Sequence, residues 1–217
     1  MDLYGNQHRA LQKEFETEKL ADAVSANIVV PELAPEHIGF IESRDMFFLS
    51  TVDHRGYPTC SYKGGSVGFV KAINNQTLAF PSYDGNGMFL SMGNINLNPK
   101  IGLLFIDFET PHRVRVHGDA KVSTDSHLLQ FFPGAELIVT VEISEVFINC
   151  TRYIHQYQRI KSSQYAPQKD CIVPFAQWKR IDNLQAALPE RDQHIAETLG
   201  GTITTDQYIE MVMQGKA

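Results

Sequence analysis

The first 37 residues show the apolar spacing of helices. Within residues 7–28, apolar side chains recur mostly every four positions, which places them on one face of a helix. They are Leu11, Phe15, Leu20, Val24 and Ile28. This pattern predicts one amphipathic helix over 7–28. Pro35 can open a second, short helix that ends near Arg44, because proline is tolerated in the first helical turn.

From residue 46 onward the pattern changes to short β-like runs separated by turn residues. Asp, Asn and Gly in the breaks at 53–56 and 74–76 tolerate the backbone angles of chain reversals. The predicted strands are 46–52, 58–62, 67–73, 77–80, 100–108, 113–122 and 137–148. Short runs joined by such turns are typical of an antiparallel sheet or barrel.

Three of these runs predict more than a strand. Residues 101–106 are almost continuously apolar, which indicates burial on both faces. Residues 113–122 alternate strictly, with Val114 and Val116 on the face opposite the charged residues. In 137–148 the apolar positions switch from odd to even numbers, so we expect a β-bulge near Ser144 and Glu145.

The remaining segments contain helix signals. Residues 88–96 read as a short helix after a glycine-rich stretch, and 151–163 and 175–187 read as helical or mixed. Thr204 and Gln207 have the spacing of a capping box, which predicts a last helix from that point.

Composition and charge narrow the class of protein. The chain has 217 residues, 43% hydrophobic and 20% charged, which fits one folded domain. Its net charge of −6 argues against nucleic-acid and membrane-surface partners. The three cysteines are far apart, the N-terminus lacks a signal peptide pattern, and no run approaches the roughly 20 apolar residues of a membrane span. We therefore expect a cytoplasmic protein.

Several motifs for chemistry are missing. In Lys63-Gly64-Gly65 the lysine precedes the glycines, whereas a P-loop needs it after them. The stretch 84–88 ends in Met88, a poor calcium ligand. The eight histidines show no metal-binding spacing, and no G-x-S-x-G nucleophile elbow occurs, so we expect neither a metal site nor a hydrolase.

Two segments are compatible with a bound phosphate. Lys63 ends a strand beside Gly64 and Gly65, where missing Cβ atoms can admit a ligand. Residues 81–87 lead into the predicted helix at Met88, whose free N–H groups favour an anion. The alternative is that these residues are ordinary turns with a solvated lysine. Arg113 and Arg115, on one strand face, have the same two interpretations.

Read together, the residues resemble one family. The matching runs are FLSTVD at 48–53, KGG at 63–65, GFV at 68–70, LAFP at 78–81, YDGNGMFLS at 83–91, GLLFIDF at 102–108, RVRVHG at 113–118 and NCTRYIH at 149–155. They resemble, in order and content over roughly 38–180, the pyridoxamine 5'-phosphate oxidase-like FMN-binding split barrels. The resemblance implies an α+β fold, a six-stranded antiparallel split β-barrel with flanking helices. The single domain 1–217 would have its core at 38–150, with helical extensions at 1–37 and 151–217.

The resemblance also implies a site and a partner. In this family FMN lies at the interface of a two-fold homodimer. By position, Lys63, Ser82 and Asn86 correspond to phosphate or ribityl contacts, Phe80 and Pro81 to ring contacts, and Arg113 to a group that reaches the ring. The remaining implied cofactor-binding residues are Gly64, Gly87, Met88 and Arg115.

One departure limits the implied activity. Pyridoxamine phosphate oxidases proper carry an Arg-Lys pair where this chain has Gly87 and Met88, and their C-terminal arginine-rich signature is not evident here. We therefore do not expect vitamin B6 synthesis. The resemblance implies an FMN-dependent oxidoreductase acting on a small molecule. The alternatives are a non-catalytic flavin carrier or sensor, and a barrel that binds a deazaflavin or haem.

Overall fold

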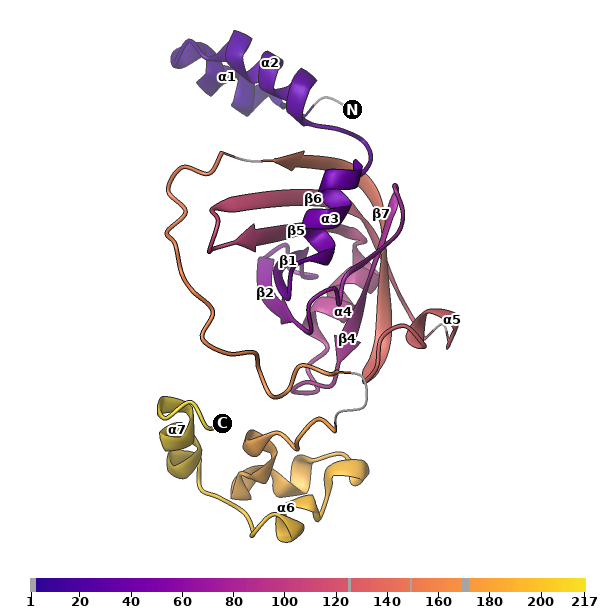
Figure 1. Cartoon of the computed structure of the whole chain (residues 1–217), viewed down its shortest axis with the longest axis vertical. Helices are drawn as coiled ribbons and strands as arrows, with labels where there is room; N and C mark the ends of the chain where they lie inside the picture. Colours follow the sequence, from indigo (N-terminus) through magenta and orange to yellow (C-terminus); the bar gives the residue numbers. More distant parts are fainter. Residues whose placement is uncertain (1–2, 125, 149, 169–171) are drawn as a thin grey trace. The chain divides into compact units, whose positions relative to one another are not determined.

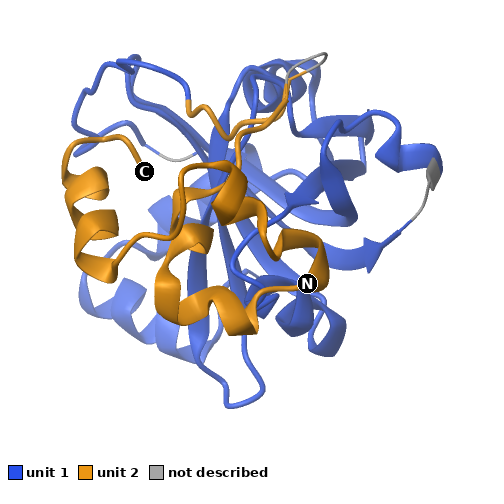
Figure 2. Cartoon of the chain, turned by 90° about the horizontal axis from the view of Figure 1, so that it is seen from below, with its two compact units in different colours: residues 1–162 blue, residues 163–217 orange. Residues whose placement is uncertain are grey.

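The computed structural model describes residues 3–124, 126–148, 150–168 and 172–217. The chain divides into two compact units, residues 1–162 and residues 163–217, coloured separately in Figure 2. None of the helices in the described residues has the length and apolar character needed to cross a membrane.

The first unit contains one antiparallel sheet of seven strands, one more than the resemblance implies (Figure 1). The strand order is β2-β1-β5-β6-β7-β4-β3. The strands are β1 (Met46–Val52), β2 (Pro58–Gly64), β3 (Lys71–Asn74), β4 (Thr77–Tyr83), β5 (Lys100–Asp107), β6 (His112–Ser123) and β7 (Ala135–Ile148). β1 and β2, and likewise β3 and β4, pair as hairpins at the two turns that the sequence predicts. In the first turn the Asp53 carboxylate accepts the N–H groups of Arg55 and Tyr57.

The sheet is curled so that distant strands share one core. β1 and β4 are far apart in the strand order, yet the ring centroids of Phe47 and Phe80 lie 5.0 Å apart. The ring centroid of Phe47 also lies 5.2 Å from that of Phe105 in β5, and all three side chains are fully buried. This interior confirms the predicted split-barrel fold with flanking helices. The helices of this region are α3 (Pro35–Glu42), α4 (Leu90–Leu97) and the short α5 (Ser126–Leu129).

The long strands follow the predicted alternation. In β6, Val114 and Val116 are buried while the alternating Arg113 and Arg115 are half-exposed. In β7 the register shifts between His117 and Gly118 of its neighbour, which leaves Ser144 as the extra residue and confirms the predicted bulge. The prediction for β5 is wrong on one face, because Gly102, Leu104 and Ile106 are half-exposed while the residues between them are buried.

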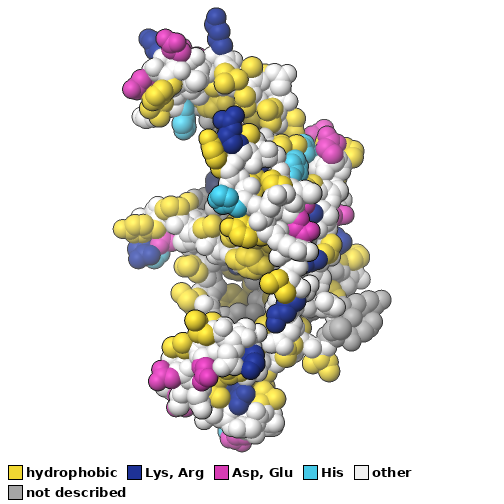
Figure 3. Space-filling view, turned by 60° about the vertical axis from the view of Figure 1, so that its left-hand side comes forward, with side chains coloured by type: hydrophobic (Ala, Val, Ile, Leu, Met, Phe, Trp, Pro, Cys, Tyr) yellow, Lys and Arg dark blue, Asp and Glu magenta, His cyan; other side chains and the backbone are white. Residues whose placement is uncertain are grey.

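Two predicted elements are shorter or divided. The strand predicted at 67–73 forms only from Lys71, because Gly68 adopts a left-handed φ of 77° that an extended strand cannot contain. The helix predicted over 7–28 is two helices, α1 (Asn6–Glu14) and α2 (Glu18–Ile28). Glu16 between them has a φ of 56°, which ends the first helix. Apolar side chains on this helix pair remain exposed, as the top of Figure 3 shows.

The second unit consists of short helices. They are three 3₁₀-helices, η1 (Gln177–Arg180), η2 (Asp182–Ala187) and η3 (Glu190–Asp192), followed by α6 (Ile195–Thr198) and α7 (Thr205–Met213). The capping box at α7 is confirmed, because Thr204 Oγ1 accepts the N–H of Gln207 at 3.2 Å and Gln207 Oε1 accepts that of Thr204 at 2.8 Å. The segment 151–163 contains no helix, contrary to the helical interpretation.

Candidate functional site

A pocket of about 370 Å³ lies where β2 and β4 end beside the first turn of α4. It brings together five residues that the sequence proposes for cofactor binding. They are Lys63, Ser82, Asn86, Gly87 and Met88. The two phosphate-compatible segments, separated by about twenty residues in the chain, therefore line one pocket.

Lys63 supplies the positive charge of this pocket. It is paired with Phe47 across β1 and β2, so its side chain is on the inward side of the sheet. Burial lowers the pKa of its ammonium group. Among the described residues, no carboxylate forms an ion pair with it at 4.0 Å or less. A half-buried cation without a counter-charge is costly, and a bound anion would offset that cost.

The first turn of α4 supplies hydrogen-bond donors. No side chain caps this helix and no acidic residue occupies its first turn, so its leading N–H groups are available to an anion. Ser91 in this turn is buried and lies 3.0 Å, Oγ to Oγ, from Ser61 of β2. Asn94 donates from Nδ2 to Thr51 Oγ1 at 2.9 Å, which fixes α4 against β1.

The loop between β4 and α4 is held in an unusual conformation. Asn86 Oδ1 accepts the N–H of Met88 at 3.1 Å, and Gly87 has a φ of 76°. Phe89 has a φ of 47°, a left-handed angle that is strained for a residue with a bulky side chain. Such strain is concentrated at ligand sites more often than elsewhere, and here it orients the start of α4 toward the pocket.

Five of the ten predicted ligand residues lie outside the pocket, and three of these are Phe80, Pro81 and Gly64. Phe80 is fully buried against Phe47 in the barrel interior, and Pro81 is also buried, so neither side chain is available to a ring cofactor in this conformation. Gly64 does not open the backbone to a ligand, because a Cβ atom there would lie 2.8 Å from the Tyr62 ring. The missing side chain at Gly64 accommodates an aromatic residue of the same chain.

Arg113 and Arg115 face the other side of the sheet. They alternate with the buried Val114 and Val116, so the chain does not bring them to the Lys63 pocket. Arg115 lines a separate cleft of about 810 Å³ with His117 and Glu145. His117 Nδ1 lies 3.2 Å from Glu145 Oε2. Arg113 Nε is buried and has no hydrogen-bond partner among the residues that the structure describes.

The structure adds residues to the pocket that the sequence interpretation missed. Ser61 precedes Lys63 by two positions in a strand and therefore shares its face, a period that could have revealed it. Tyr83 also lines this pocket. Burial raises its pKa to about 12, so its hydroxyl remains protonated at neutral pH. Within the described ranges, no three His, Cys, Asp or Glu side chains are grouped to hold a metal ion.

Comparison with known proteins places the chain in a family. The family model described as pyridoxamine 5'-phosphate oxidase matches residues 33–164, more than half of the chain. A search of curated proteins finds no match.

Solved structures that the comparison finds include HupZ of Group A Streptococcus, which is 16% identical with a TM-score of 0.44 and a match over 58% of this chain and 100% of that one. General Stress Protein 26 of Bacillus anthracis is 15% identical over 51% and 88% of the chains, with a TM-score of 0.40. An FMN-binding protein of Syntrophomonas wolfei is 11% identical over 67% and 98%, with a TM-score of 0.41. By the family match, the chain belongs to the pyridoxamine 5'-phosphate oxidase family.

Proposed function

We propose that this protein binds FMN and acts as an FMN-dependent oxidoreductase on a small organic molecule. The observation that supports this proposal is the half-buried Lys63 ammonium, which faces a polar pocket and has no carboxylate partner in the described part of the chain. The phosphate of FMN supplies the missing negative charge. Lysine contacts phosphates as a point charge, a role that suits a position at the end of a strand.

The residues present fit the phosphate and the polar chain of FMN. Lys63 would bind the phosphate together with the N–H groups of the first turn of α4, while the Ser61, Ser82 and Ser91 hydroxyls and the Asn86 amide would bind the remaining polar atoms. Exposed apolar side chains at the opening, such as Met88 and Phe89, would contact the ring. With Gly87 and Met88 in place of two cations, Lys63 carries the charged contact of this site.

FMN, when bound, supplies the electron transfer, so the protein needs no nucleophile of its own. The chain binds and orients the cofactor. Lys63 would hold the phosphate end in place. The Tyr83 hydroxyl stays protonated, so it can donate one hydrogen bond and accept others through its oxygen lone pairs. The buried Ser91 and Met92 exclude water from the floor of the pocket.

We also propose that two copies form a homodimer through the outer face of the sheet. A continuous row of cross-strand neighbours runs over this face from β2 to β7. In order, its members are Tyr62, Phe48, Leu104, Arg115 and Phe147. The row is aromatic or apolar except for Arg115, whose guanidinium lies 5.2 Å from the Phe147 ring. Tyr62 also lines the Lys63 pocket, so the interface would adjoin the cofactor.

The direct test is the purified protein and its affinity for FMN. We expect flavin absorption bands, release of FMN on denaturation with its mass confirmed, and saturable binding of added FMN to the apoprotein. Lys63→Met should weaken FMN binding about 10- to 100-fold, which is the loss of affinity expected when one charge-assisted hydrogen bond is removed. Lys63→Arg should recover most of that loss.

Lys121→Met is the matched control, since Lys121 is an exposed strand lysine outside the pocket and its removal should leave FMN affinity unchanged. A colourless protein with no affinity for FMN would refute the proposal. Equal affinities for wild type and Lys63→Met would place the phosphate elsewhere.

A second candidate function is a flavin carrier without turnover. It is favoured by the chemistry of the pocket, whose lining among the described residues includes no His, Cys, Asp or Glu to act as a general acid or base. Oxidation of NADH or NADPH coupled to reduction of a small acceptor would decide for the enzyme. The same mass analysis distinguishes FMN from a deazaflavin, and a Soret band would identify haem.

A further inference from the structure

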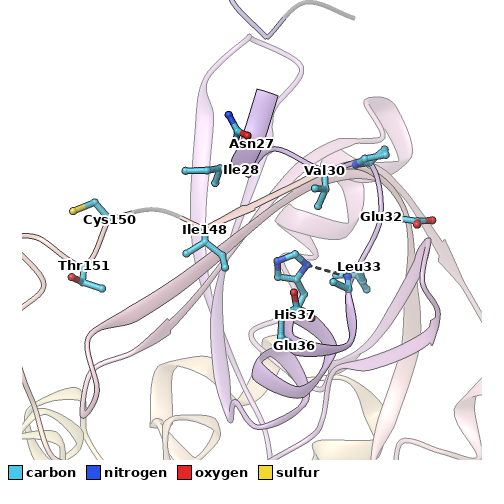
Figure 4. A pocket seen from close by; sticks show the side chains of 12 residues that line it. Asn27, Ile28, Val30, Glu32, Leu33, Glu36, His37, Ile148, Cys150 and Thr151 are labelled. Atoms are coloured by element: carbon cyan, nitrogen blue, oxygen red, sulfur yellow. Dashed lines mark hydrogen bonds between the residues drawn. The ribbon is translucent and has the colours of Figure 1, made fainter. Parts of the chain in front are cut away.

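A larger cleft of about 900 Å³ lies away from the Lys63 pocket and shares no lining residue with it. Its walls are the segment that joins α2 to α3, the first turn of α3 and the end of β7 (Figure 4). The apolar part of the lining includes Ile28, Val30, Leu33 and Ile148. A cleft of this size with mostly apolar walls and few polar groups is the usual form of a small-molecule site.

The cleft is held by fixed backbone contacts. Val30 and Val146 exchange two hydrogen bonds, at 2.9 Å and 2.8 Å, so the segment before α3 is tied to β7. Leu33 donates its N–H to the Asn75 carbonyl at 2.7 Å, and its side chain is buried in the main core. These contacts preform one wall, which lowers the ordering cost of binding a ligand.

His37 provides a polar group directed into this cleft. It is only 7% exposed, and its Nδ1 accepts the N–H of Ala34 at 3.1 Å. Because Nδ1 is the acceptor, the proton of the neutral ring is on Nε2. In Figure 4 the ring edge opposite the dashed bond points toward the space between Ile28, Val30 and Ile148. Within the described residues, no protein atom accepts a hydrogen bond from this Nε2.

The charges at the cleft select against anions. Burial lowers the pKa of His37, with nearby His112 adding to the shift and Glu36 opposing it, so the ring is neutral at neutral pH. Among the described residues, the lining contains Glu32 and Glu36 but neither lysine nor arginine. Glu32 accepts a hydrogen bond from Asn75 Nδ2 at 2.7 Å and remains exposed. A phosphorylated ligand such as FMN is therefore disfavoured here.

We propose that this cleft is a second ligand site, which binds a small uncharged molecule with an apolar ring and a carbonyl oxygen. The ring packs against Ile28, Val30 and Ile148, and the carbonyl accepts the hydrogen bond of His37 Nε2. This site is independent of the FMN proposal, because the two pockets share no lining residue in the described part of the chain.

Benzamide and benzoate form a matched pair of probes, since they have nearly the same shape and differ in charge. With the full-length protein, benzamide should bind saturably with a Kd on the order of 1 mM, a value typical of so small a ligand. Benzoate should bind at least about tenfold more weakly, because Glu32 and Glu36 repel it. The Lys63→Met variant should bind benzamide as the wild type does.

Two substitutions separate the two nitrogens of His37. His37→Asn places its Oδ1 where Nδ1 was, so the bond from Ala34 is kept while the Nε2 donor is lost. Benzamide should then bind about five- to tenfold more weakly, with Tm little changed. His37→Gln retains a donor at the Nε2 position, so it should bind benzamide better than His37→Asn although its Tm is lower.

Cysteine alkylation gives a second readout. Cys150 lines the cleft and Cys60 lies on β2 outside it, and both are exposed. Saturating benzamide should slow the reaction of iodoacetamide with Cys150 and leave Cys60 unaffected. The proposal is overturned if benzamide fails to bind, if His37→Asn binds it as the wild type does, or if both cysteines respond equally.

Discussion

Asp107 shows how one carboxylate fixes the hairpin between β5 and β6. It accepts hydrogen bonds from the N–H groups of Glu109 and Thr110 and from the Thr110 hydroxyl, and it pairs with Arg44 at 2.8 Å. Desolvation acts to raise its pKa, but these hydrogen bonds and the Arg44 charge outweigh it, so the pKa is lowered. All of these contacts favour the ionised form.

The lowered pKa gives stability a defined pH dependence. The contribution of Asp107 is fully present above its ordinary pKa of 3.8 and is lost as the pH falls through the lower folded value. Asp107→Asn should cost about 1–2 kcal/mol at pH 7 and should flatten the loss of stability below pH ~4. Urea unfolding from pH 7 to pH 3 measures both effects. Glu14→Gln, at an exposed helix end, should change neither.

At the scale of single residues, the sequence predicted some of the site well. Lys63, Ser82 and Asn86 reach one pocket because a strand end and a helix start are both local features with clear signals. The roles of Gly64 and Phe80 were missed for different reasons. Gly64 lies beside the ring of Tyr62, two positions earlier in the same strand, a local contact that the period of two could have indicated. Phe80 is buried against Phe47, and this contact depends on how the sheet curls.

The β6–β7 ladder depends on one glycine at the bulge. A Cβ atom at Gly118 would lie 2.4 Å from the Glu142 carbonyl oxygen, and backbone atoms of a paired strand cannot move away cheaply. Gly118→Ala should therefore destabilise the protein by about 3 kcal/mol, measured by urea unfolding.

Gly93 in α4 is the matched control for that substitution. Nothing lies within 4 Å of a Cβ atom there, and alanine favours a helix over glycine by about 0.5–1 kcal/mol. Gly93→Ala should raise stability. If both substitutions had the same effect, the close approach at the bulge would not be the cause.

At the scale of elements, period-two patterns predicted most strands within a few residues. β1 agrees at both ends, and the odd-to-even switch located Ser144 in β7. Two errors in element boundaries occurred where a single residue has a left-handed backbone. Gly68 shortens β3, and Glu16 divides the N-terminal helix, although glutamate rarely adopts such angles and gives no sequence signal for the break.

The whole molecule should be a dimer if the outer row of the sheet is an interface. Leu104 lies in the middle of that row and is half-exposed. Leu104→Lys would place a positive charge next to Arg115 in the proposed interface, and burying two like charges without a counter-charge is costly. Light scattering coupled to size exclusion should show a dimer for the wild type and a monomer for Leu104→Lys. A wild-type monomer would contradict the interface.

The second unit has a polar interior contact of its own. Lys179 Nζ lies 2.7 Å from Asp192 Oδ2, and both side chains are largely buried. Removing one partner of such a pair costs about 3–5 kcal/mol. Asp192→Ala should therefore increase hydrogen exchange within 175–203, while β5 and β6 keep their protection. Asp206→Asn, a substitution at an exposed position, should leave hydrogen exchange unchanged in both regions. Faster exchange in β5 of the Asp192→Ala variant would contradict the expectation that the first unit keeps its stability when the second is destabilised.

One edge of β7 contacts two different neighbours on the two sides of Ser144. Before it, Glu142 is paired with Thr77 of β4, and after it, Val146 is bonded to Val30. Insertions on its two sides should therefore differ in outcome. An added residue at 136–142 would shift the register between β7 and β4. One at 146–148 would leave that register unchanged and turn the Ile148 side chain away from His37. Length variation in this strand can thus reshape the cleft beside His37 while the pairing of β4 with β7 persists.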